Sequence, residues 1–203
     1  MKPQYGFDPM VFKMLKKKGE AMKPEDRRGV LVLDEMSISE GVNFDTEKLS
    51  VMGFTDLGDY TPDHQKTERA DHALILIFQP FRGKWVQNIA AFLSKGAANG
   101  EVLSHLVTEC ICLLENVGFN VDVVTADGGQ WNRGMWKRFG LKDLDASCVH
   151  PCSNDNEITT TNSRRLWFCS DFSHLIKNFR NFIMSKEAIM VVSYHYFYCR
   201  MHV

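Results

Sequence analysis

The sequence predicts an α/β fold in which a mixed β-sheet is flanked by helices, and three observations support this. Apolar runs typical of strands fill the first half of the chain, and a short turn-like connection between 73–78 and 86–93 favours antiparallel pairing. A long amphipathic segment follows at 101–117. Beyond it, strand-like and helix-like segments alternate, which is typical of strands covered by helices.

Composition limits the classes of function. With 203 residues, 44% hydrophobic and 24% charged, the chain can bury the core of one domain. We expect an intracellular protein with six reduced cysteines and no membrane partner, because neither an export signal nor a run of about 20 apolar residues is present.

A formal charge of −1 argues against DNA binding by overall charge, so any DNA contact would depend on local basic clusters. Ordinary solvated surface charge explains each cluster equally well. The clusters are Lys16 to Lys18, Arg27 with Arg28, Lys137 with Arg138, Arg164 with Arg165, and Lys177 with Arg180.

Local signals place the elements of the first half. Asp8-Pro9 predicts the start of a short leading helix, which the Lys23-Pro24 pair ends. The apolar run Gly29 to Leu33 predicts a central strand with Asp34 at its end. A further strand is expected at 49–54, and the polar stretch 56–71 is expected to be an exposed connection.

The second half alternates more regularly. Apolar residues recur at three-and-four spacing over 101–117, with Asn99-Gly100 before and Gly118 after, which predicts a helix. The remaining expected elements are a strand at 121–126, a helix at 131–139, a loop at 143–165, a strand at 166–169 and a helix at 174–184. This element order is that of an RNase H-like fold.

Two aspartates follow predicted strands of one sheet. If the strands ending at Asp34 and Asp127 are parallel neighbours, their carboxylates lie side by side and could share divalent cations. Carboxylate oxygens suit Mg²⁺ or Mn²⁺ better than zinc. An aspartate after a strand is, however, also a common turn former or helix cap.

Four sequence blocks around these aspartates resemble, in order, the signature blocks of P-element-type transposases, including their THAP-type relatives. The blocks are Val32-Leu33-Asp34-Glu35-Met36-Ser37-Ile38, Trp85-Val86-Gln87, Thr125-Ala126-Asp127-Gly128-Gly129-Gln130-Trp131-Asn132-Arg133, and Asp171-Phe172-Ser173-His174-Leu175-Ile176-Lys177-Asn178 with Arg180-Asn181. The resemblance runs from about Gly6 to about Asn181.

The resemblance implies that Asp34 and Asp127 are the first two members of a catalytic acidic triad that ligates Mg²⁺. Glu35 should point to the opposite side of its strand, so it is not expected to be a ligand. Asn132 and Arg133 could position a phosphate, with helix capping and surface exposure as equally good interpretations.

In this family a guanine-nucleotide-binding domain is inserted after the last block. Lys177 and Asp171 could therefore contact GTP, Lys177 as a point charge on a phosphate. A helix N-cap explains Asp171 equally well. The family's third acidic residue is a Glu beyond that insertion, and we expect the chain, which stops at Val203, to lack it.

The sequence therefore predicts a leading helix and linker at 1–28, a partial RNase H-like domain at 29–185, incomplete at its C-terminal end, and a divergent tail at 186–203. The implied function is metal-dependent cleavage and strand transfer of transposon DNA ends in the nucleus, with self-association of the full-length protein. The alternative is a non-catalytic remnant or interaction module, and we expect this isolated chain to be inactive.

Two other chemistries have less support. A phosphotransferase with Asp34 as nucleophile receives no support from the accompanying blocks. Zinc is not expected at Cys148-Val149-His150-Pro151-Cys152, because no second pair of ligands follows at a structural-site spacing. Cys110 and Cys112 should not face one another on a helix.

Overall fold

The computed structural model describes residues 5–46, 50–142, 145–153, 163–185, 188–192 and 198–202, which form two compact units, Met1–Cys169 and Ser170–Val203. The helices are α1 (Pro9–Glu20), α2 (Gly100–Asn116), α3 (Gln130–Arg138) and α4 (Phe172–Met184), with 3₁₀ turns at Pro24–Arg27 and Asp63–Gln65. The strands are β1 (Gly6–Phe7), β2 (Arg28–Ser37), β3 (Asn43–Asp45), β4 (Ser50–Met52), β5 (His72–Pro80), β6 (Gln87–Ser94), β7 (Asn120–Ala126), β8 (Ser147–Val149), β9 (Arg165–Ser170), β10 (Ala188–Val192) and β11 (Tyr198–His202).

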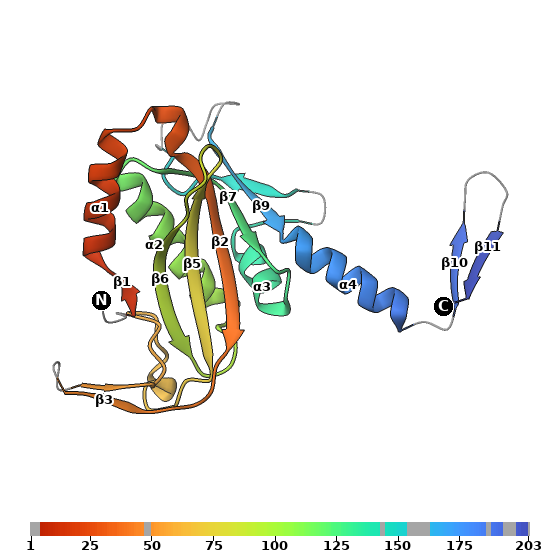
Figure 1. Ribbon diagram of the computed structural model, residues 1–203, viewed down its shortest axis with the longest axis horizontal. Helices are drawn as coiled ribbons and strands as arrows, with labels where there is room; N and C mark the ends of the chain where they lie inside the picture. The colour runs from red at the N-terminus through yellow and green to blue at the C-terminus, as the bar shows by residue number, and fades with distance from the viewer. Residues whose placement is uncertain are drawn as a thin grey trace. The chain divides into compact units, whose positions relative to one another are not determined.

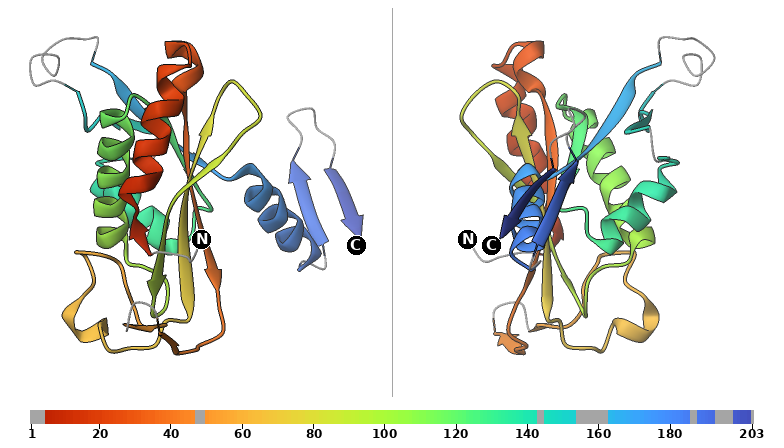
Figure 2. Two further views of the ribbon diagram at one scale, coloured as in Figure 1. Left: turned by 60° about the vertical axis from the view of Figure 1, so that its left-hand side comes forward. Right: turned by 90° about the vertical axis from the view of Figure 1, so that its right-hand side faces the viewer.

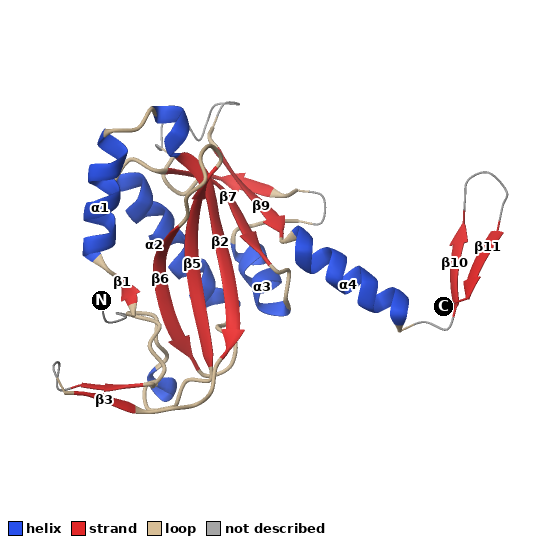
Figure 3. Cartoon of the chain, viewed as in Figure 1, coloured by secondary structure: helices blue, strands red, loops and turns tan. Residues whose placement is uncertain are grey.

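A mixed seven-stranded sheet organises the first unit (Figures 1 and 3). Its order is β1-β6-β5-β2-β7-β9-β8. The central strand β2 runs antiparallel to β5 and parallel to β7. β5 and β6 are antiparallel, as their short connection predicted. The expected α/β architecture with a mixed sheet is therefore confirmed.

One face of this sheet is covered and the other is partly open. In β2, Leu31 and Leu33 are buried, whereas Val30 and Val32 between them are only half-buried. The buried residues pack against α1, α2 and α3, which contribute side chains such as Phe12, Leu106 and Met135 to the core. Figure 2 shows α1 and α2 side by side on the covered face. Side chains in register with Val32 consequently face the open side.

The helices begin where the sequence signals predicted. Asp8 caps α1 by accepting a hydrogen bond from the Met10 amide, and Pro9 occupies the first turn. The Asn99 side chain caps α2 by accepting hydrogen bonds from the amides of Glu101 and Val102. The first turn of α2 is thereby fixed shortly after the end of β6.

β2 is longer than the sequence predicted. We expected the strand to end at Asp34, but it continues to Ser37, so Asp34 lies within it. The reason is that β5 pairs with β2 up to Ser37 opposite His72, while pairing with β7 stops at Val32. The charged residues end the apolar run without ending the antiparallel ladder.

Other differences are local. The stretch 56–71 is not uniformly exposed, because Leu57 and Ala70 are buried. The expected strand at 49–54 is the shorter β4, which pairs with β3 outside the main sheet. The expected loop at 143–165 contains β8, which pairs with β9. These strands span three residues each, which is too short for a periodic sequence signal.

The second unit contains α4 and the antiparallel hairpin β10-β11. Contacts divide the chain between Cys169 and Ser170, whereas our sequence interpretation placed a boundary after 185. Residues 5–28, expected as a leading segment, contribute Phe12 and Leu15 to the core of the first unit. None of the helices in the described ranges is long and apolar enough to cross a bilayer.

Candidate functional site

The parallel pairing of β2 and β7 aligns the two predicted carboxylates. The last pair of this ladder is Val32 opposite Thr125. Asp34 and Asp127 each follow that pair by two residues, Asp34 within β2 and Asp127 directly after the end of β7. Neighbouring strands lie about 4.8 Å apart, which is the spacing expected at this point of the sheet. The fold therefore brings Asp34 and Asp127 to the same end of the paired strands β2 and β7, where both residues are exposed.

The turn after β7 holds Asp127 in a defined position. Its Oδ1 atom accepts hydrogen bonds from the Gly129 amide at 2.8 Å and from Asn132 Nδ2 at 2.6 Å. A Cβ atom at Gly129 would lie 3.0 Å from the same oxygen, so glycine suits this close turn. The second oxygen, Oδ2, has no hydrogen-bond partner within the described ranges, nor does the Asp34 carboxylate. Within the described ranges, three carboxylate oxygens of Asp34 and Asp127 are thus without a hydrogen bond.

Glu35 lies on the other side of β2, as the sequence predicted. Its carboxylate accepts a hydrogen bond from the Ala98 amide at 3.0 Å, which ties β2 to the loop before α2. Burial raises the pKa of Glu35, the Ala98 hydrogen bond opposes that rise, and the negative charge of Asp127 adds to it. The charge of Asp127 acts on Glu35 because β2 and β7 end at the same edge of the sheet.

A polar network that sequence reasoning missed fixes the same loop. Asp71 accepts hydrogen bonds from the Gly96 amide at 2.6 Å and from His72 Nδ1 at 2.7 Å, and its carboxylate pairs with Lys95 at 3.0 Å. The His72 hydrogen bond, followed by those from Gly96 and Lys95, lowers the pKa of Asp71 far below its usual range. No local sequence signal joins residues 71 and 96, because the contact depends on the pairing of β5 with β6.

Asp34 and Asp127 can bind a divalent cation through oxygen atoms, which are the ligands that Mg²⁺ and Mn²⁺ prefer. In the part of the chain that the structure describes, no group of three or more His, Cys, Asp or Glu side chains is arranged to hold a metal ion. The residues present therefore fit a partial site of two carboxylates. A complete two-metal centre would need a further ligand.

The second unit carries the other two predicted site residues. Asp171 caps α4, because its Oδ1 accepts hydrogen bonds from the amides of Ser173 and His174, and Oδ2 accepts one from His174 Nδ1. The His174 hydrogen bond is the main cause of a lowered pKa at Asp171. Lys177 is exposed on α4. A nucleotide contact by either residue stays a prediction.

Several basic residues named above as possible DNA contacts are used within the chain. Arg28 and Arg164 pair with Asp122, and Arg164 also pairs with Glu115. Arg138 pairs with Glu101 on the protein surface. Lys18 lies 3.3 Å from the centre of the Trp85 ring. Internal pairing leaves these cations less available for phosphate groups.

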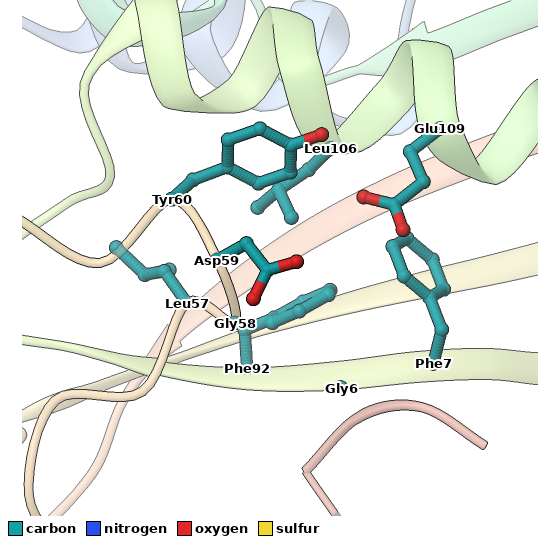
Figure 4. A pocket seen from close by; sticks show the side chains of 9 residues that line it. All are labelled: Gly6, Phe7, Leu57, Gly58, Asp59, Tyr60, Phe92, Leu106 and Glu109. Atoms are coloured by element: carbon teal, nitrogen blue, oxygen red, sulfur yellow. The ribbon is translucent and has the colours of Figure 1, made fainter.

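Two pockets lie away from the carboxylates. Figure 4 shows one of about 180 Å³, with Asp59 and Glu109 on its two sides and Tyr60 and Phe92 in its wall. Burial raises the pKa of Tyr60, and the nearby charge of Glu109 adds to the rise. The other pocket, of about 290 Å³, includes Trp131. Neither lining contains Asp34 or Asp127.

The sheet order and covering helices define an RNase H-like protein. A chain of the Drosophila P element transposase strand transfer complex matches this structure with a TM-score of 0.69 and 18% sequence identity, over 94% of this chain and 36% of that chain. The fold expected from the sequence is therefore confirmed.

The family model for the TNP-like, RNase H N-terminal domain matches residues 3–140, and the chain belongs to this family. The human DNA transposase THAP9 is 23% identical over 195 residues, which are 94% of this chain and 21% of that relative. The resemblance to P-element-type transposases is thus confirmed, and the chain spans about a fifth of the length of this curated relative.

Proposed function

We propose that this chain is the RNase H-like segment of a P-element-type DNA transposase, in which Asp34 and Asp127 hold Mg²⁺ or Mn²⁺. The observation that supports the proposal is the β2-β7 register, whose last pair, Val32 opposite Thr125, lies two residues before both Asp34 and Asp127. A bound divalent ion would supply charge stabilisation and an activated oxygen for phosphodiester cleavage and strand transfer at transposon DNA ends.

The chain's own contribution is to orient the ligands. The Gly129 amide and the Asn132 side chain both donate to Oδ1 of Asp127, which leaves Oδ2 as the oxygen available to an ion. Asn132 is consequently a positioning residue rather than a ligand. A carboxylate that is already held in one direction, as that of Asp127 is, lowers the ordering cost of binding an ion.

The test is a Mn²⁺ titration of the purified chain, with binding followed by calorimetry or by the spin resonance signal of free Mn²⁺. Asp34→Asn and Asp127→Asn should each weaken binding at least about tenfold, the size typical of altered metal-site residues. Asp63→Asn is the matched control, since Asp63 is exposed, lies outside β2 and β7 and pairs with Lys66. Equal affinity in all four proteins would overturn the assignment.

A second candidate is a non-catalytic DNA-binding or interaction module. It is favoured by one observation, namely that no third metal-ligating side chain joins Asp34 and Asp127 in the described ranges. A strand-transfer assay with the full-length protein distinguishes the two candidates. Activity that is lost in Asp34→Asn and Asp127→Asn supports the transposase, whereas DNA binding without Mn²⁺-dependent cleavage supports the module.

Further parts of the proposal concern the full-length protein. Its DNA substrate implies a nuclear location, and self-association stays a prediction. GTP would contact Lys177 and Asp171 together with chain outside this segment. Lys177→Ala in the full-length protein should weaken GTP binding without unfolding α4, whose cap is Asp171. Unchanged GTP affinity would remove Lys177 from the nucleotide site.

A further inference from the structure

Two cysteines that are far apart in the sequence meet on the surface of the first unit. Cys112 lies on α2, and Cys152 follows β8. Their Sγ atoms are 3.4 Å apart, and both are free thiols. A disulfide bond is about 2.05 Å long, so its formation requires the sulfurs to approach by roughly 1.4 Å. Rotation of an exposed side chain such as that of Cys152 can supply much of this movement.

A buried histidine holds Cys152 beside α2. His150 is 1% exposed, and its Nε2 donates a hydrogen bond to the Val121 carbonyl at 2.9 Å. Its Nδ1 accepts a hydrogen bond from the Cys152 amide at 3.1 Å. The His150 amide in turn donates to the Arg164 carbonyl. These bonds fix the backbone of Cys152 to β7 and to the residue before β9.

The same contacts argue against a metal at these cysteines. Both ring nitrogens of His150 are used in hydrogen bonds, so neither is free as a ligand. Cys148 packs against the hydrophobic core, and the sulfur in contact with Cys152 is that of Cys112. The geometry selects the Cys112 and Cys152 thiols rather than a Cys148-His150-Cys152 set of zinc ligands, which the sequence did not favour either.

We propose that Cys112 and Cys152 form a modification site, at which an intramolecular disulfide forms by exchange with a low-molecular-weight disulfide of the glutathione type. The thiolate of Cys112 attacks one sulfur of that reagent, forming a mixed disulfide and releasing one glutathione thiolate, which takes up a proton. The sulfur of Cys152 then attacks Cys112 Sγ, breaks the mixed disulfide and releases the second glutathione. Two protein thiols are oxidised and one glutathione disulfide is reduced to two thiols.

The order of attack follows from the contacts of Cys152. Although the residue as a whole is exposed, its sulfur lies against Cys112. Burial of the sulfur, followed by the hydrogen bond to Cys112, raises the pKa of Cys152 to about 12. A thiol that stays protonated is a poor first nucleophile, so Cys112 attacks first and Cys152 resolves the mixed disulfide.

The bond would cross-link the connection between β8 and β9 to α2. Cys112 and Cys152 are 40 positions apart in the chain. That closed loop includes β7, Asp127 directly after it, and α3, which carries Asn132. The inference does not depend on metal binding or DNA cleavage, since it rests on the two sulfurs and His150.

The experiment treats the purified, fully reduced chain with mixtures of oxidised and reduced glutathione, blocks the remaining thiols, and maps the peptides by mass spectrometry. The expected product joins the Cys112 and Cys152 peptides with the loss of two hydrogens. Cys152→Ser should accumulate glutathione on Cys112 instead. The matched control Cys148→Ser should retain the cross-link.

Three results would overturn the proposal. They are separate glutathione adducts without a cross-link, a bond between Cys148 and Cys152, and stoichiometric zinc in the purified chain that is lost in Cys152→Ser. Melting of each reduced variant is measured first. Cys112→Ser, which should also abolish the cross-link, replaces a residue of α2 and could unfold the chain. Cys152→Ser decides the outcome in that case, because residue 152 is exposed and its replacement should not disturb the fold.

Discussion

Replacement of Arg164 by methionine should destabilise the chain, because this side chain joins two poorly exposed carboxylates. Its guanidinium donates to Glu115 at 2.8 and 2.9 Å and to Asp122 at 3.2 Å. The side chains of Glu115 and Asp122 are 15% and 11% exposed. After the replacement, Asp122 still pairs with Arg28. Glu115 retains a hydrogen bond from the Val121 amide and a contact with His150 Nε2 at 3.5 Å, but no arginine partner.

The magnitude follows from this unequal loss. Leaving a buried carboxylate without its cation lowers the free energy of unfolding by about 3 kcal/mol. For a chain of this size, that corresponds to a fall in melting temperature of roughly 9 °C. Arg138→Met is the matched control, because Arg138 and Glu101 are each more than half exposed. Such a surface pair contributes about 0.5 kcal/mol.

The assay is urea unfolding followed by circular dichroism, with all proteins at the same pH and ionic strength. The account predicts a much larger loss for Arg164→Met than for Arg138→Met, with unchanged dependence on urea concentration. The reasoning is refuted if the two variants lose equal stability. It is also refuted if added salt reduces the stability loss of Arg164→Met and that of Arg138→Met by the same proportion. Salt screens surface ion pairs, whereas it screens buried pairs much less.

Three further predictions concern stability. Burial, followed by the Arg164 charge, lowers the pKa of His150, so the unfolded chain binds its proton more readily and stability should fall as pH drops below about 6.5. His150→Gln should remove that part of the pH dependence in urea titrations, and an unchanged slope would contradict it. Gly100→Ala should lower the free energy of unfolding by about 2 kcal/mol, because the added Cβ would lie 2.6 Å from the Gly134 backbone. A Cβ at Gly41 would meet no atom within 4 Å, so Gly41→Ala should melt at the temperature of the parent. The free energy of unfolding of the oxidised chain should exceed that of the reduced chain by about 4 kcal/mol, because the disulfide closes a loop of 40 positions. Equal melting temperatures would refute this.

Elements with strong local signals could be predicted from the sequence alone. The start of α1 at Asp8-Pro9 and the extent of α2 after Asn99 agree with the structure to within a residue or two. Capping side chains and apolar periodicity act within a few residues, so they are visible in sequence. The sequence left the parallel pairing of the strands before Asp34 and Asp127 as a condition, and the structure shows that β2 and β7 meet it.

Features that depend on long-range pairing could not be predicted. Arg164 was considered a possible DNA contact, but its partners Glu115 and Asp122 lie 49 and 42 positions away. The end of β2 at Ser37 depends on β5 rather than on its own composition. The role of Asn132 was left open, and the structure shows it bound to Asp127.

The most direct test of the central claim is the position of a bound divalent ion. Crystals of the chain soaked in Mn²⁺ would reveal the ion by its anomalous scattering. The account predicts a peak within bonding distance of both Asp34 and Oδ2 of Asp127, on the open face of the sheet. A peak that contacts other residues, or Asp127 without Asp34, would contradict the shared site.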